Sequence, residues 1–89
     1  MREVKTLNVS AGVELVFEFE NAGKVFLIKN FSSGSIRCSM GGAFVQAKSI
    51  CINSNMFEEL SDSANVLKVH NKIAVYPYGD GEVEIQCLE

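Results

Sequence analysis

Two tyrosines are the residues of this chain best suited to hold a ligand. Tyr76 and Tyr78 flank Pro77 and stand two positions apart, so in a strand their rings share one face. β-Sandwich proteins bind carbohydrates through exposed aromatic rings, and the chain has no tryptophan for that purpose. We interpret the pair as a candidate ligand platform, with packing at the rim of the fold as the alternative.

The remaining reactive side chains match no known catalytic or metal-binding pattern. His70 is the single histidine, so a Ser-His or Cys-His pair would have to use it. We expect it in a solvent-exposed turn. Cys38, Cys51 and Cys87 are odd in number and widely spaced, unlike a disulfide framework or a zinc ribbon. We expect three reduced thiols that act as small core residues, no metal site and no cofactor.

Several glutamates stand at alternate positions, the spacing that places side chains on one face of a strand. Glu14, Glu18 and Glu20 share one face of a predicted strand, and Glu82 and Glu84 share another. Neighbours on such a face are about 7 Å apart, a separation that some glycosidases use. Those enzymes also need a deep cleft, for which the chain is too short. We therefore interpret these residues as a solvated face that discourages aggregation, and we expect a protein that is not an enzyme.

The elements that must position these residues follow a period of two, which is typical of strands. Residues 13–20 alternate between apolar and acidic side chains, and residues 24–30 follow after Asn21, Ala22 and Gly23, which suggests a hairpin. A second hairpin is predicted from residues 66–69 and 73–76, across His70 and Asn71. Further strands are predicted at residues 4–9, 35–40, 47–53 and 82–88. Residues 53–63 are predicted to form a polar loop or a single helical turn, with Met56 or Phe57 closing the end of the core.

This pattern predicts one all-β domain over residues 1–89. Seven or eight short strands with turns between them indicate an antiparallel β-sandwich, jelly-roll-like, or a small barrel. The 89 residues are 47% hydrophobic and 21% charged, as in globular proteins. The net charge is −3 and the basic residues are scattered, which argues against binding to nucleic acid or to anionic membranes. The first residues lack the apolar stretch of a signal peptide, so we expect a protein that is not secreted by that route and that stays in a reducing cytoplasm.

The strand at residues 24–30 is apolar on both faces, because it contains Val25, Phe26, Leu27 and Ile28 in succession. In one hairpin register Val25 and Leu27 point outward, and in the other Phe26 and Ile28 do. Either register predicts an apolar surface beside Val16, which the segment at residues 53–63 or another subunit would cover. The predicted partner or oligomer interface comprises Val16, Val25, Phe26, Leu27 and Ile28.

Two segments carry a resemblance to a group of viral proteins. Residues 21–36 (NAGKVFLIKNFSSGSI) resemble a hairpin strand, polar turn and next strand of small β-sandwich proteins of bacteriophages and prophages, and residues 79–86 (GDGEVEIQ) are similar to their last strand. The resemblance covers about a third of the chain. It implies a virion structural protein, such as a head-decoration or head–tail accessory protein, in the host cytoplasm or virion, with itself and other assembly proteins as partners. A small carbohydrate-binding module that uses Tyr76 and Tyr78 is the alternative.

Overall fold

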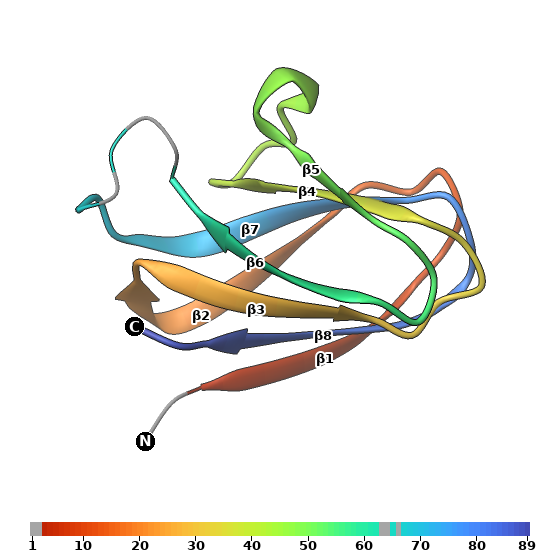
Figure 1. Cartoon of the computed structure of the whole chain (residues 1–89), viewed down its shortest axis with the longest axis horizontal. Helices are drawn as coiled ribbons and strands as arrows, with labels where there is room; N and C mark the ends of the chain where they lie inside the picture. Colours follow the sequence, from red (N-terminus) through yellow and green to blue (C-terminus); the bar gives the residue numbers. More distant parts are fainter. Residues whose placement is uncertain (1–2, 63–64, 66) are drawn as a thin grey trace.

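The computed structural model describes residues 3–62, 65 and 67–89 and shows two four-stranded antiparallel sheets packed face to face (Figure 1). The sheets have the strand orders β1-β8-β3-β6 and β2-β7-β4-β5. The prediction of an all-β sandwich is confirmed. The elements of this part of the chain are β1 (Val4–Val9), β2 (Leu15–Gly23), β3 (Val25–Asn30), β4 (Ile36–Met40), a short 3-10 helix η1 (Gln46–Lys48), β5 (Ile50–Ile52), β6 (Phe57–Ser61), β7 (His70–Pro77) and β8 (Gly81–Cys87).

The strand pairing is that of one long hairpin rolled into a sandwich. β4 pairs with β5 at the tip of this hairpin, and outward from the tip β3 pairs with β6, β2 with β7 and β1 with β8. The roll then closes through two further pairings, β3 with β8 and β4 with β7. Consecutive strands therefore change sheet at every step except between β4 and β5. This is the topology of a jelly roll.

The predicted hairpin of residues 13–20 and 24–30 is wrong. β2 and β3 belong to different sheets, and the chain crosses between them after Gly23. Gly23 packs against the chain's last residues, where a Cβ would lie 2.3 Å from Cys87 Sγ. The backbone N–H of Lys24 donates to Glu89 O at 2.5 Å. A glycine turn is compatible with a hairpin and with a change of sheet, and these contacts with residues far along the chain decide between them.

The second predicted hairpin is also wrong, because His70 and Asn71 lie inside one strand, β7. β7 pairs with β2 and β4. Of the expected partner strand at residues 66–69, Val66 lies outside the described residues and Leu67 forms part of a turn. The partners of β7 are distant in the sequence, so the local pattern could not reveal them.

The middle of the chain differs from the prediction in two places. The strand predicted at residues 47–53 is reduced to the three residues of β5, and η1 precedes it. The predicted loop at residues 53–63 contains a strand, β6, which pairs with β3. Met56 and Phe57 are exposed and do not close the core; Leu60 is buried instead. β6 is an edge strand, which explains why its sequence is largely polar.

The core lies between the two sheets and follows the predicted alternation. Phe17 and Phe19 on β2 point inward, whereas Glu18 is exposed. The rings of Phe19 and Phe26, one from each sheet, lie with their centroids 5.2 Å apart. Burial of each such side chain is worth about 1.5–3 kcal/mol. The core residues are Val9, Phe17, Phe19, Phe26, Ile28, Ile36, Cys38, Ile52, Leu60, Ile73, Val75, Val83 and Ile85.

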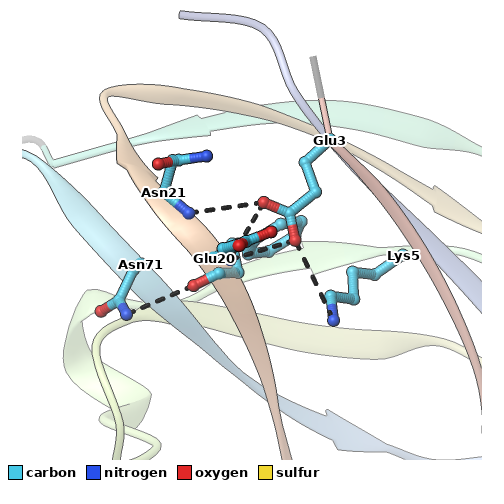
Figure 2. Close-up of polar contacts among 6 residues, drawn as sticks. Glu3, Lys5, Glu20, Asn21 and Asn71 are labelled. Atoms are coloured by element: carbon cyan, nitrogen blue, oxygen red, sulfur yellow. Dashed lines mark hydrogen bonds and ion pairs between the residues drawn. The ribbon is translucent and has the colours of Figure 1, made fainter. Parts of the chain in front are cut away.

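Glu3, the residue before β1, links the start of β1 to β2 through its side chain. Its carboxylate accepts hydrogen bonds from the backbone N–H of Glu20 at 3.0 Å and of Asn21 at 3.4 Å, and Lys5 lies 3.9 Å away (Figure 2). The pairing of β2 with β7 is irregular between Glu18 and Gly23. The carboxylate therefore satisfies backbone donors at the edge of β2.

Within the described residues no helix has the length and apolar character needed to cross a bilayer.

Candidate functional site

The five residues of the predicted interface do not share one surface. Phe26 and Ile28 are fully buried in the core, because β3 turns these side chains toward the other sheet. Val25 and Leu27 are half-buried on the outer face of β3, although neither predicted hairpin register exists, because β3 pairs with β6 and β8 and not with β2. Val16 is exposed on β2, in the other sheet, so it lies on the opposite side of the molecule from Leu27.

A group of exposed apolar side chains lies close to β3, where β3 meets the start of β6. Phe31, Met56 and Phe57 have exposed fractions of 56%, 56% and 65%. Their backbones adjoin: Asn30 N donates to Met56 O at 2.9 Å, and Phe57 is opposite Lys29 in the pairing of β3 with β6. We call this group the Phe57 patch. The sequence pattern favoured Met56 and Phe57 as residues that close the core or belong to a segment covering β3, so their exposed position was missed.

The two tyrosine rings lie close together, although Tyr78 is beyond the end of β7, and a third ring joins them. Tyr76 lies on the outer face of β7, and Tyr78 follows the buried Pro77. Their ring centroids are 5.3 Å apart with an interplanar angle of 56°. The Phe44 ring, from the connection between β4 and β5, lies 5.6 Å from Tyr76 at 34°. The three rings form a row along the surface, with Tyr78 half-exposed.

The connection that carries Phe44, residues 41–49, lies over the outer face of the sheet β2-β7-β4-β5. Its backbone is held by Val45 N donating to Ser39 Oγ at 3.1 Å and by Gly41 N donating to Lys72 O at 2.8 Å. Ser39 is fully buried although it is on the outward-facing side of β4. The covered outer face is therefore on this sheet, and the 41–49 loop covers it. The prediction had instead placed the covered face on β3, with residues 53–63 or another subunit as the cover.

The aromatic row borders a hollow of about 320 Å³, which is lined by Glu14, Phe44, Gln46, Tyr76 and Tyr78. Glu14 comes from the connection between β1 and β2, and its Oε2 accepts a hydrogen bond from Phe44 N at 3.3 Å. Gln46 is the first residue of η1. The hollow thus combines three aromatic rings with one carboxylate and one amide. Sequence reasoning found the two tyrosines by their spacing. It missed Phe44 and Gln46, which reach the site only through the folding of the loop.

His70 occupies a different environment from the predicted exposed turn. It is the first residue of β7, and its Nε2 lies 2.9 Å from Asp62 Oδ2. The side chains of His70 and Asp62 are 15% and 19% exposed. Asp62 follows β6 and His70 begins β7, so the pair joins the two sheets at this end. Both residues line a second hollow of about 380 Å³, together with Met40, Gly41, Val45, Lys48, Ser61 and Lys68.

Among the residues that the structure describes, the cysteines and the acidic residues are dispersed over the fold and do not form a common site. Cys38 is in the core, and burial, with a smaller contribution from Cys51, raises the pKa of its thiol. Cys51 is exposed, which corrects the prediction that all three thiols are core residues. Glu84 forms an ion pair with Lys29 at 3.2 Å. In the described part of the chain, His, Cys, Asp and Glu side chains do not gather in groups of three or more that could hold a metal ion.

No protein-family model matches the chain, and no curated protein matches it. Among solved structures, the chain is similar to a de novo designed double-stranded β-helix that was determined by solution NMR. The two chains are 15% identical, the similarity covers 94% of each, and the TM-score is 0.56. At this level of identity the similarity supports the fold alone, a small sandwich of two antiparallel sheets.

Proposed function

We propose that this protein is a non-catalytic structural protein that forms homo-oligomers within a bacteriophage or prophage virion assembly. The observation that carries the proposal is the Phe57 patch, with three large apolar side chains each more than half exposed. Contiguous exposed apolar surface is characteristic of interaction sites. The jelly-roll topology is compatible with this role, since capsid proteins and lectins both use it. The protein would act in the host cytoplasm or in the virion.

The free edges of the sheet β1-β8-β3-β6 favour association through side chains. β6 carries Glu58 and Glu59 in its centre, and β1 carries Lys5 on its inward-facing side. Charges at these positions hinder the addition of a further strand. A partner would therefore contact this sheet through side chains such as those of the Phe57 patch, at the start of β6, and not by strand addition.

A second copy of the chain is the partner that fits the surroundings of the patch. Lys29, which is paired with Glu84 of the same chain, and Glu59 both lie beside it, on the paired strands β3 and β6. A surface with both signs of charge around an apolar centre is self-complementary about a two-fold axis, the commonest symmetry of homo-oligomers. Burial of the three apolar side chains would contribute about 3–5 kcal/mol, because each is already partly covered.

The test is the solution mass of the whole protein, measured by light scattering after size-exclusion chromatography. We expect an oligomer for the wild type and a monomer for Phe57→Asp, because the substitution removes the most exposed apolar side chain of the patch and introduces a charge that would lose its water on association. Leu67→Asp is the matched control: Leu67 is 75% exposed and lies away from the patch, between β6 and β7. Its mass should equal that of the wild type. A monomeric wild type, or an unchanged mass for Phe57→Asp, would contradict the proposal.

A further inference from the structure

The hollow beside the aromatic row has a composition that limits its ligands. Tyr78 presents a half-exposed ring, and the Tyr76 ring lies beside it at an interplanar angle of 56°. A pyranose ring has one face made of C–H groups, which packs on the electron-rich face of an aromatic ring. Glu14 and Gln46 stand at the rim of the same hollow. A carboxylate accepts hydrogen bonds and an amide both donates and accepts them, as the hydroxyl groups of a sugar require.

The carboxylate of Glu14 limits the charge of the ligand. It lines the hollow and would repel a phosphate group. Arg37 is directly opposite Tyr76 in the pairing of β4 with β7, but its Nη1 donates to Ser49 Oγ at 3.2 Å and it does not line the hollow. A nucleotide is therefore disfavoured relative to a neutral polyhydroxyl compound. An ammonium group suits aromatic rings beside a carboxylate, so it is the rival ligand that the experiment must exclude.

The walls of the hollow are held in place before any ligand binds. The N–H groups of Phe44 and Val45 donate to Glu14 Oε2 and Ser39 Oγ, and Ser49 Oγ donates to Gln46 O at 2.7 Å. On the other side, Tyr78 N donates to Ser35 O at 2.9 Å. A preformed site loses little conformational entropy on binding. Its volume is at the lower limit of ligand sites, roughly 300 Å³, which suits one or two sugar units.

We propose that the hollow formed by Glu14, Phe44, Gln46, Tyr76 and Tyr78 is a carbohydrate site that holds a neutral pyranose against the Tyr78 ring. It goes beyond an assembly role, because it gives the protein a recognition surface distinct from the Phe57 patch. Glu14 and Gln46 orient the sugar through its hydroxyl groups, and Phe44 supports the row of rings from the side of the loop. Repeated copies of this site in an oligomer would raise the avidity for a polysaccharide surface.

The experiment is an NMR titration of the whole 15N-labelled protein with neutral sugars. The probes are methyl glucoside, methyl galactoside, N-acetylglucosamine and the tetrasaccharides of the cellulose, starch and chitin series. We expect saturable shifts at the amides of Phe44, Gln46 and Tyr78 for at least one of them, with a Kd on the order of 1 mM. Tyr78→Ala should weaken binding at least about tenfold, and Tyr78→Phe, which keeps the ring, should retain it.

Two controls separate this site from the oligomer interface and from misfolding. Gln46→Ala removes a rim amide on an exposed helical turn without altering the aromatic row, so it should weaken sugar binding in a protein that unfolds like the wild type. Phe57→Asp should bind sugar normally whatever its oligomeric mass. The proposal is wrong if no sugar gives saturable shifts at the three amides, or if Tyr78→Ala and Gln46→Ala both bind sugar as well as the wild type. It is also wrong if tetramethylammonium saturates the site and none of the sugars does.

Discussion

Replacement of Asn30 by alanine should destabilise the protein far more than the loss of an exposed polar side chain. Asn30 is fully buried at the end of β3. Its Nδ2 donates to Gly34 O at 2.9 Å and to Ile52 O at 3.0 Å, and its Oδ1 accepts from Ser32 N at 2.9 Å and from Ser32 Oγ. One side chain thus joins the β3–β4 turn to the end of β5.

The magnitude follows from the groups that would lose their partners. In Asn30→Ala, Gly34 O keeps a hydrogen bond from Ser32 Oγ at 2.9 Å. Ser32 N and Ile52 O lose the partner that Asn30 supplies, in residues that are 2% and 1% exposed. Each unsatisfied buried group costs about 1–3 kcal/mol. The free energy of unfolding should therefore fall by about 2–6 kcal/mol, a large share of the stability of a domain this small.

Urea unfolding followed by far-UV circular dichroism measures this loss, and it suits a chain without tryptophan. Asn21→Ala is the matched control, because Asn21 is exposed and its replacement should change the stability by less than about 0.5 kcal/mol. Equal unfolding midpoints for the two variants would refute the reasoning.

The charged replacement at the same position tests the direction of the hydrogen bonds. In Asn30→Asp a carboxylate oxygen would face Gly34 O and Ile52 O, and burial would raise the pKa of the introduced carboxyl above its ordinary value. Between the unfolded and folded pKa values the folded state binds more protons. The loss of stability relative to the wild type at the same pH should therefore shrink as the pH falls through this range. A loss that stayed constant with pH would contradict the arrangement.

Two further predictions concern close packing and the buried thiol. In Gly79→Ala the new Cβ would lie 2.3 Å from Gly34 N, so we expect the free energy of unfolding to fall by about 2–4 kcal/mol. Gly12→Ala is the comparison: Gly12 has a φ of +77° but no atom within 4 Å of the new Cβ, so the fall should be about 1–2 kcal/mol. Equal losses for the two variants in urea unfolding would argue against the contact. Iodoacetamide at pH 8 should modify Cys51 in the native protein and spare Cys38, whose thiol is buried and has a raised pKa. Mass spectrometry of the peptides checks this, and equal labelling of both thiols before unfolding would disprove it.

The alternation of apolar and polar residues predicted the core better than it predicted the connections. It placed Phe17 and Phe19 inward because side chains alternate in any strand, whichever strand is the neighbour. It could not tell that the chain changes sheet after Gly23, since the contacts with Cys87 and Glu89 that fix this crossing come from the far end of the sequence. β6 was missed because an edge strand with two adjacent glutamates looks like a loop.

The candidate site was predictable only for its two tyrosines. Tyr76 is on β7 and Tyr78 follows Pro77, where β7 ends, so their spacing of two residues in nearly extended chain already brings the rings close together. Phe44, Gln46 and Glu14 come from two connections, and no periodicity links them to β7. The paired glycines at positions 41 and 42 marked a break in the chain. The hydrogen bonds of Glu14 and Ser39, which turn the loop onto the sheet, are tertiary contacts without a local signal.

The position of β8 has a consequence for how the protein is made. β8 lies between β1 and β3, so β1 has its neighbour only when residues Gly81–Cys87 have been synthesised. During synthesis the sheet β1-β8-β3-β6 cannot be completed until Cys87 has left the ribosome. Until then the edges of β1 and β3 that β8 will occupy are free to pair with other strands. Because β1 pairs with β8 and β2 with β7, loop closure spans nearly the whole chain, and we expect folding on the slow scale of milliseconds to seconds, at roughly the rate of other all-β sandwiches. A cell that makes this protein in quantity would therefore benefit from chaperones that shield the half-finished sheet.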